Sequence, residues 1–188
     1  MNAAATLFEE ALDWLRDNYS SFLFRTEYDV VTVLWGCMVR EAKAQGLAIQ
    51  IDYEHYVKVA AGRKQCDIVA LSSEGEILLG AEIKYEPSRT RPDIANRQLK
   101  HGRPQHLLPG HGVAGHLCDI EKVRMYVAEG RVPVAYAVLV DENSYHYGLM
   151  KREQLSLPEG VSWVEWGARS PDSFETAIMI YRYLPRVV

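Results

Sequence analysis

Apolar residues recur at helical spacing in two early segments of the chain. Residues 6–18 carry apolar side chains along one side of such a helix. These apolar residues are Leu7, Ala11, Leu12 and Leu15. A second helix is expected over residues 27–45, where Gly46 is a stop signal. Thr26, followed by Asp29 three residues later, predicts a capping box in which Asp replaces the usual Glu.

The pattern changes to period two in the next part of the chain. Residues 48–60 alternate between apolar and polar positions, which predicts a half-buried strand. The apolar face expected for this strand holds Ile49, Ile51, Tyr53, Val57 and Val59. Residues 66–71 and 77–85 predict two further strands, joined by a turn at Glu74-Gly75. Residues 134–140 form a continuous apolar run, which favours a central strand covered on both faces.

The remaining segments mix helical and extended patterns. Residues 86–118 are expected to be irregular, because Pro, Gly, Arg and His are frequent there. A helix is expected over residues 119–129, begun by an Asp cap and ended by a glycine. Two short strands are predicted at 145–150 and 161–166. A last helix is predicted over 171–185, with a proline at each end.

This order of elements predicts a single α/β domain of the α+β kind over residues 1–188, with a central mixed sheet flanked by helices. Neither GxGxxG nor GxxxxGK[ST] occurs, so the phosphate-cradling loops of nucleotide-binding folds are not expected. No run reaches the ~18 apolar residues of a membrane-spanning helix, and the first residues do not resemble a signal peptide. The three widely spaced cysteines favour reduced thiols and a cytoplasmic location.

Charged residues in the predicted hairpin suggest chemistry. With Glu74-Gly75 as a two-residue turn, Asp67 lies directly opposite Glu82, and Lys84 shares the strand face of Glu82. Opposed carboxylates need a cation between them, or one must hold a proton. Mg²⁺ or Mn²⁺ would suit such oxygen ligands. The alternative is a solvated strand face that carries ordinary surface charges.

Asp67, followed by Glu82-Ile83-Lys84 in the next strand, resembles the signature of the PD-(D/E)XK nuclease superfamily. A helix that carries an acid, here Glu27, precedes the three strands, as in that superfamily. Helix 119–129 and strand 134–140 would complete its restriction-endonuclease-like αβββαβ core over about residues 26–142. The chain departs from the signature at Cys66, where the superfamily has proline.

The resemblance implies roles for these residues. Asp67, Glu82 and the carbonyl of Ile83 would bind Mg²⁺ or Mn²⁺, with Glu27 assisting directly or through water. Lys84 would be the catalytic lysine. Glu54, in the preceding strand, is a weaker candidate for the acidic cluster. An alternative for Glu27 is ordinary charge chemistry in the first turn of a helix.

The irregular segment 87–118 forms a basic, histidine-rich insertion in an otherwise acidic chain of net charge −4. Together with residues just before the strand of Asp67, its cations predict a phosphate-tracking surface. The residues expected on that surface are Arg63, Lys64, Arg89, Arg91, Arg97, Lys100 and Arg103. A zinc site in the histidine-rich part is an alternative that matches no familiar ligand spacing. Its ligands would come from His101, His106, His111, His116 and Cys118.

Three hypotheses for the whole protein follow. The first is a metal-dependent nuclease, with DNA as the expected substrate, acting in repair, defence or the processing of mobile elements. The second is a catalytically inactive member of the same fold that binds nucleic acid or a protein. The third is an interaction protein in which both acids are surface residues. A homodimer is a further expectation, with Trp163, Trp166 and the C-terminal helix as its interface.

Overall fold

The chain is built around a mixed sheet with helices on both faces. The computed structural model describes residues 2–87, 116–142, 152, 154, 161–165 and 179–183. The helices are α1 (Ala3–Asn18), the 3-10 turn η1 (Tyr19–Ser21), α2 (Glu27–Ala44) and α4 (His116–Ala128). The strands are β1 (Ile49–Val59), β2 (Gly62–Ser72), β3 (Ile77–Glu86), β4 (Ala135–Asp141), β5 (Val161–Glu165) and β6 (Met179–Tyr183).

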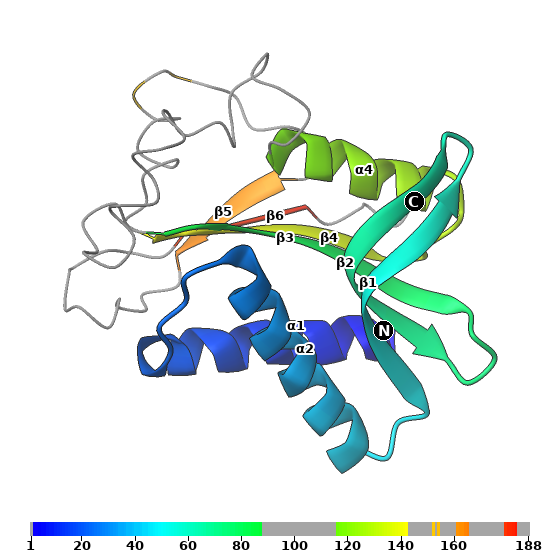
Figure 1. Ribbon diagram of the computed structural model, residues 1–188, viewed down its shortest axis with the longest axis horizontal. Coiled ribbons are helices and arrows are strands. Elements are labelled where there is room, and N and C mark those ends of the chain that lie inside the picture. The colour runs from blue at the N-terminus through cyan, green and yellow to red at the C-terminus, as the bar shows by residue number, and fades with distance from the viewer. Residues whose placement is uncertain are drawn as a thin grey trace.

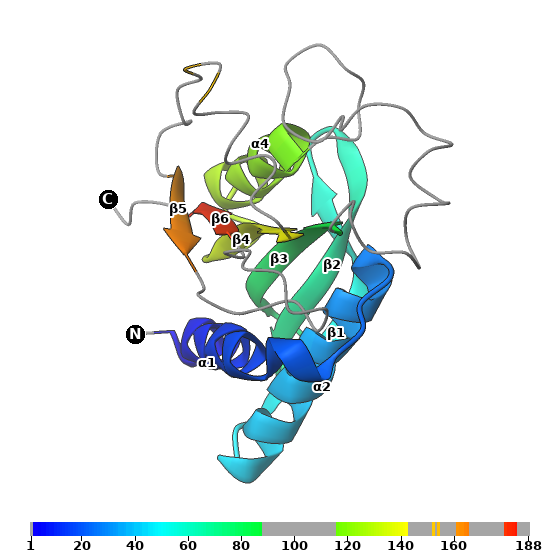
Figure 2. The same cartoon turned by 90° about the vertical axis from the view of Figure 1, so that its left-hand side faces the viewer.

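Within the described residues the strands form one sheet in the order β1-β2-β3-β4-β6-β5. Strands β3 and β4 are parallel, and the other neighbours are antiparallel. Helices α1 and α2 cover one face of the sheet, and α4 covers the other (Figures 1 and 2). The predicted α+β class, with a mixed sheet flanked by helices, is confirmed. None of the helices in this part of the chain is long and apolar enough to cross a membrane.

The sheet separates two hydrophobic cores. The larger one, between the sheet and α1 and α2, contains Leu7, Leu34, Ile83 and Val138. The smaller one, beneath α4, contains Val57, Val123 and Leu139. Strand β4 is buried along its whole length, as its continuous apolar run predicts. Strand β3 lies between β2 and β4. Helix α4 covers the face of β3 that carries Glu82 and Lys84, because Lys122 of that helix contacts Glu82.

Helix α2 begins at the predicted capping box. The Thr26 hydroxyl accepts a hydrogen bond from the Asp29 backbone N–H, and the Asp29 carboxylate accepts one from the Thr26 N–H. A hydrogen bond also connects the loop before this helix to the sheet. The hydroxyl of Tyr85 on β3 lies 3.1 Å from the Phe24 carbonyl and 2.8 Å from the Glu142 carboxylate. Together these contacts fix the first turn of α2.

Substituting Thr26 by alanine should lower the free energy of unfolding by about 1 kcal/mol, because one N-terminal N–H of α2 loses its partner. Urea unfolding measures this loss. Thr32→Ala, on the same helix but beyond its first turn, is the control. A loss below about 0.3 kcal/mol would mean that the cap adds little to the fixing of α2.

A β-bulge in β3 sets the register of the hairpin. Near the turn the Ser72 N–H donates to the Glu76 carbonyl and Leu71 pairs with Ile77, which corresponds to a three-residue loop. Beyond the bulge the pairs are Ala70–Leu79, Val69–Gly80 and Ile68–Ala81. The predicted register is therefore confirmed, but the bulge restores it rather than a two-residue turn.

The bulge also changes which side chains share a face. Leu78 and Leu79 both pack in the core of α1 and α2, whereas Ile77 packs in the core of α4. Simple alternation along β3 would place Ile77 and Leu79 on one face, and the bulge separates them. The Leu78 carbonyl accepts a hydrogen bond from the side chain of Asn2, the N-cap of α1, at 2.9 Å.

Strand β1 bends where the sequence predicts one continuous apolar face. Glu54 has a left-handed backbone with φ of 53°. Ile51 packs in the core of α1 and α2, whereas Val57 and Val59 pack beneath α4. The single face predicted from Ile49 to Val59 is thus wrong, because a left-handed residue interrupts the alternation.

Beyond this bend the hairpin of β1 and β2 curls toward α4 (Figure 1). The carboxylate of Glu129, next to the end of α4, accepts a hydrogen bond of 2.7 Å from the N–H of Ala60 at the hairpin tip. The hairpin is therefore held at both its base and its tip.

Several element boundaries differ from the prediction, among them the start of α1, which lies at Ala3 rather than at residue 6. Strand β2 begins at Gly62 rather than residue 66, because it pairs with β1 as far as that glycine. Helix α4 begins at His116, and Asp119 lies in its first turn rather than at its cap. Residues 179–183 form β6 between β4 and β5, not part of a C-terminal helix. This segment, MIYRY, favours a strand through its aromatic and β-branched residues. The strand predicted at 145–150 lies outside the described residues.

Candidate active site

Strands β2 and β3 separate at Asp67. Their pairing ends at Ile68–Ala81, although β2 extends back to Gly62 and β3 continues to Glu86. The Asp67 carboxylate accepts a hydrogen bond of 2.7 Å from the Ile83 backbone N–H. A side chain thus takes the role of a strand carbonyl and holds Asp67 at the point where the two strands diverge.

Glu82 lies beneath α4 with only 1% of its surface exposed. Its carboxylate accepts hydrogen bonds from Lys122 Nζ at 2.6 Å and from the Tyr126 hydroxyl at 3.2 Å. Burial and, to a lesser extent, the charge of Asp67 raise the pKa of Glu82 to about 8, against the opposing charge of Lys122. Glu82 is therefore a carboxyl group that requires either a proton or a nearby cation.

Lys84 connects three elements of the fold. Its Nζ lies 3.0 Å from Glu27 Oε1 on α2 and 3.9 Å from Asp119 Oδ2 on α4. Burial alone would lower the pKa of Lys84, but the carboxylates of Asp119, Glu27 and Asp67 outweigh it and raise the pKa. Lys84 is therefore a protonated, half-buried cation among acids.

Burial also destabilises the charged forms of two further acids, Glu27 and Asp119. Burial raises the pKa of Glu27, which Lys84 opposes and Asp67 reinforces. Burial likewise raises the pKa of Asp119 to about 6, against the opposing charge of Lys84. The charge of Asp67 thus raises the pKa of Glu27, Glu82 and Asp119. The four carboxylates therefore form one electrostatic cluster around two lysines. We call this set the acid cluster; its members are Glu27, Asp67, Glu82 and Asp119.

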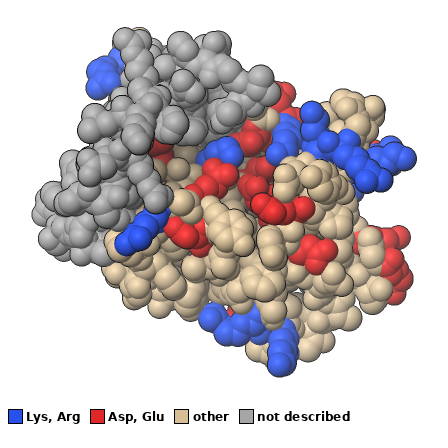
Figure 3. All heavy atoms as spheres, viewed as in Figure 1, with Lys and Arg blue, Asp and Glu red and all other residues tan. Residues whose placement is uncertain are grey.

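The acid cluster lies between the first turns of α2 and α4 and the divergence of β2 from β3. On the face drawn in Figure 3, acidic side chains gather in the middle and basic side chains lie among and beside them. The structure thus brings together four residues predicted from the sequence, namely Glu27, Asp67, Glu82 and Lys84. Glu82 is almost fully buried and Asp67 is partly buried, so neither acid is an ordinary solvent-exposed residue of the hairpin.

The sequence reasoning missed three residues of α4. Asp119, Lys122 and Tyr126 are spaced three and four residues apart, which places them on one face of a helix. That spacing was the available signal. It identifies no partner by itself, because nothing in the sequence shows that this face lies over Glu82.

Other predicted residues lie away from the acid cluster or outside the described residues. Glu54 is exposed at the bend of β1. Arg63 and Lys64 are exposed on β2, within the hairpin rather than before the strand. The predicted basic residues of the insertion lie outside the described residues, namely Arg89, Arg91, Arg97, Lys100 and Arg103. A metal-binding role for the Ile83 carbonyl stays a prediction.

The predicted zinc ligands are only partly within the described residues. His101, His106 and His111 lie outside them, and so does Trp166 of the predicted dimer interface. His116 begins α4, and Cys118 is exposed on that helix rather than in an irregular segment. Zinc binding and dimerisation therefore stay predictions.

The oxygen ligands of the acid cluster suit a hard divalent cation. Across residues 2–87 and 116–142, however, no three His, Cys, Asp or Glu side chains converge closely enough to hold a metal ion as they stand. Lys122 contacts Glu82 instead, and Lys84 contacts Glu27. The two ammonium groups supply the neutralising charge that a metal ion would supply, so metal binding requires Lys122 to move from Glu82.

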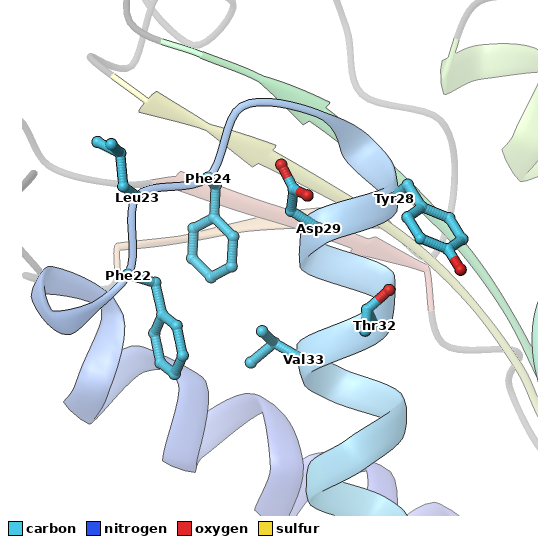
Figure 4. A pocket seen from close by; sticks show the side chains of 7 residues that line it. All are labelled: Phe22, Leu23, Phe24, Tyr28, Asp29, Thr32 and Val33. Carbon is cyan, nitrogen blue, oxygen red and sulfur yellow. The ribbon is translucent and has the colours of Figure 1, made fainter.

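A separate hollow lies at the outer side of α2. It has a volume of about 290 Å³ and opens between this helix and the loop before it (Figure 4). Its lining is mostly apolar, formed by Phe22, Leu23, Phe24, Tyr28, Asp29, Thr32 and Val33. No residue of the acid cluster lines it, so it is not the candidate active site.

Comparison of the chain with protein-family models, with curated proteins and with solved structures gives no match. Function must therefore be argued from the geometry and charge of the acid cluster.

Proposed function

We propose that the protein is a metal-dependent nuclease that hydrolyses phosphodiester bonds, with DNA as its substrate, and a member of the PD-(D/E)XK superfamily. The observation that carries the proposal is the convergence of Glu27, Asp67, Glu82 and Lys84 from α2, β2 and β3. The order α2, β1, β2, β3, α4 and β4 supports it, because it follows the αβββαβ order of a restriction-endonuclease-like core.

Asp67 and Glu82 would hold Mg²⁺ or Mn²⁺, assisted by Glu27 and the Ile83 carbonyl. When bound, such an ion polarises a phosphoryl oxygen and lowers the pKa of a bound water. Asp67 is already oriented by the Ile83 N–H. Glu82 would be available once Lys122 withdraws from it.

Lys84 acts as a cation rather than as a base in this proposal. Its pKa is raised by the surrounding carboxylates, so it keeps its proton at neutral pH. A protonated lysine next to the acid cluster stabilises the negative charge that develops on the phosphoryl group. Glu27 positions Lys84 by accepting its hydrogen bond at 3.0 Å.

One observation favours the second hypothesis, a catalytically inactive member of the same fold. Lys122 already neutralises Glu82 at 2.6 Å, and Tyr126 occupies its other oxygen. If that ion pair never opens, Glu82 is a structural acid and the protein binds nucleic acid or a protein without cleaving. Metal affinity distinguishes the two hypotheses.

Calorimetric titration with Mn²⁺ tests the proposal. The native chain should bind the ion, and Asp67→Asn should weaken binding at least about tenfold, because one charged ligand is lost. The amide oxygen introduced by this substitution would still accept the hydrogen bond from the Ile83 N–H, so folding should persist. Glu76→Gln, an exposed acid in the turn, is the control. Equal affinity in the native chain and Asp67→Asn would exclude the metal site.

A further inference from the structure

Three tyrosines on α2 and β1 have large exposed fractions, and two of them are in contact. Tyr28 on α2 is 55% exposed, and Tyr53 and Tyr56 on β1 are 47% and 59% exposed. The rings of Tyr28 and Tyr53 meet edge to face with centroids 6.4 Å apart, and Trp35 supports Tyr53 at 5.6 Å. Grouped exposed aromatic side chains on a folded protein mark a binding surface.

The bend of β1 places Tyr53 and Tyr56 on the same side of the hairpin. Strict alternation would put residues three positions apart on opposite faces, but the left-handed Glu54 lies between them. Tyr53 faces α2 through Trp35. Val57 faces α4, so its neighbour Tyr56 turns to the other side, where Tyr53 lies.

Cations continue this surface toward the tip of the hairpin. Lys58 pairs with Arg63 across β1 and β2, and both side chains are exposed. Lys58 lies two residues from Tyr56, so both share the outward side. Figure 3 shows basic side chains gathered over this hairpin, in a chain whose net charge is −4. This local positive charge complements phosphate groups.

The surface adjoins the acid cluster at two points. Tyr28 directly follows Glu27, whose carboxylate contacts Lys84. Tyr53 pairs with Ile68, the residue after Asp67. The tyrosine surface therefore meets the acid cluster at the first turn of α2, where Tyr28 is next to Glu27.

We propose that Tyr28, Tyr53 and Tyr56 are a stacking platform for unpaired bases, and that Lys58 and Arg63 contact the phosphates of the same strand. This inference rests on the proposed nuclease function and specifies its substrate as single-stranded where it meets the hairpin. Aromatic rings stack on the faces of bases, which are accessible in a single strand and covered in a duplex.

Binding of fluorescein-labelled oligothymidylate of about 20 nucleotides, followed by anisotropy in EDTA, tests the platform without cleavage. The native chain should bind this strand at least about tenfold more tightly than a duplex of equal length. Tyr53→Ala and Tyr56→Ala should each weaken binding about tenfold, whereas Tyr53→Phe and Tyr56→Phe should retain it. Lys58→Gln should lower the salt dependence by about one phosphate contact.

Leu23→Ala is the control, since Leu23 is 50% exposed in the loop before α2 and lies across the hollow from Tyr28 rather than on the hairpin (Figure 4). Unchanged binding by both alanine variants, equal affinity for duplex, or no binding by the native chain would overturn the platform. If cleavage that depends on Lys84 persists alongside such a result, the proposed function stands and only the platform fails. Tyrosine-dependent binding without cleavage in Mg²⁺ or Mn²⁺ would remove the nuclease and keep the platform.

Discussion

Replacing Lys84 by methionine should lower the rate of metal-dependent cleavage by about 10³-fold, which is the scale of losing one charge aimed at the reacting group. Methionine keeps most of the length of the side chain and removes the ammonium group that lies 3.0 Å from Glu27. Asp67→Asn should cause a loss of similar size, through the metal site rather than through Lys84. Cleavage of labelled single-stranded DNA in Mg²⁺ and in Mn²⁺ measures both effects.

A loss of activity is informative only if the variants fold. Lys84→Met leaves Glu27 and Asp119 without the ammonium group that lies between them, and some loss of stability is expected. Asp67→Asn should keep its hydrogen bond to Ile83, and Lys43→Met controls for loss of a surface lysine. Cleavage within about twofold of the native rate in both folded variants would contradict the assignment.

Replacing Lys122 by methionine should destabilise the protein by about 1 to 1.5 kcal/mol more near pH 9 than near pH 6, because without this cation the buried Glu82 must hold a proton that it has largely released at pH 9 in the native protein. Near pH 6 the cost should be below about 1 kcal/mol, because Glu82 then holds a proton. Urea unfolding at the two pH values measures the difference. Lys122→Arg, which keeps a cation, should lose much less stability at either pH.

The sign of this pH dependence follows from proton binding. The pKa of Glu82 is about 8 in the folded protein and near its usual value of ~4.3 in the unfolded chain. The folded state therefore binds more protons between these values, and stability falls as the pH rises through that range. Removing Lys122, whose charge opposes the rise, extends the fall to higher pH. Adding Glu82→Gln should abolish this part of the pH dependence.

Mg²⁺ should partly restore the stability of Lys122→Met at high pH, because an ion bound only by the folded state stabilises it. The native chain, in which Lys122 competes for Glu82, should gain less from the same concentration. An equal loss of stability at both pH values, with no effect of Mg²⁺, would show that Lys122 acts only through the packing of its aliphatic chain.

Local sequence signals were sufficient for most of the elements and for the core of the acid cluster. The register that brings Asp67 next to Glu82 was predicted from a two-residue turn, and it holds because the bulge at Leu78 offsets the three-residue loop. The capping box located the start of α2 and thus Glu27. The buried run that became β4 was identified by its length and composition. The hairpin, the capping box and the buried strand each depend on residues close together in the chain, and a sequence pattern shows such local relations.

Contacts between residues far apart in the sequence could not be predicted from local patterns. Nothing near Lys122 or Tyr126 in the sequence indicates Glu82, which lies 40 and 44 positions away. Residues 179–183 form a strand because β4 and β5 supply hydrogen-bonding partners on both sides. The left-handed Glu54 carries no glycine or asparagine signal, so the change of face along β1 was not predictable.

The extra residue in β3 has a consequence for how the acid cluster tolerates change. Exposed hairpin loops gain and lose residues readily, and in a plain ladder such a change would turn every later side chain to the opposite face. Here the strand already absorbs one surplus position at Leu78, clamped by Asn2 from the first helix. Leu78 and its hydrogen bond to Asn2 thus fix the register of β3 beyond the bulge. The carboxylate of Glu82 and the ammonium group of Lys84 keep their orientation because that register is held.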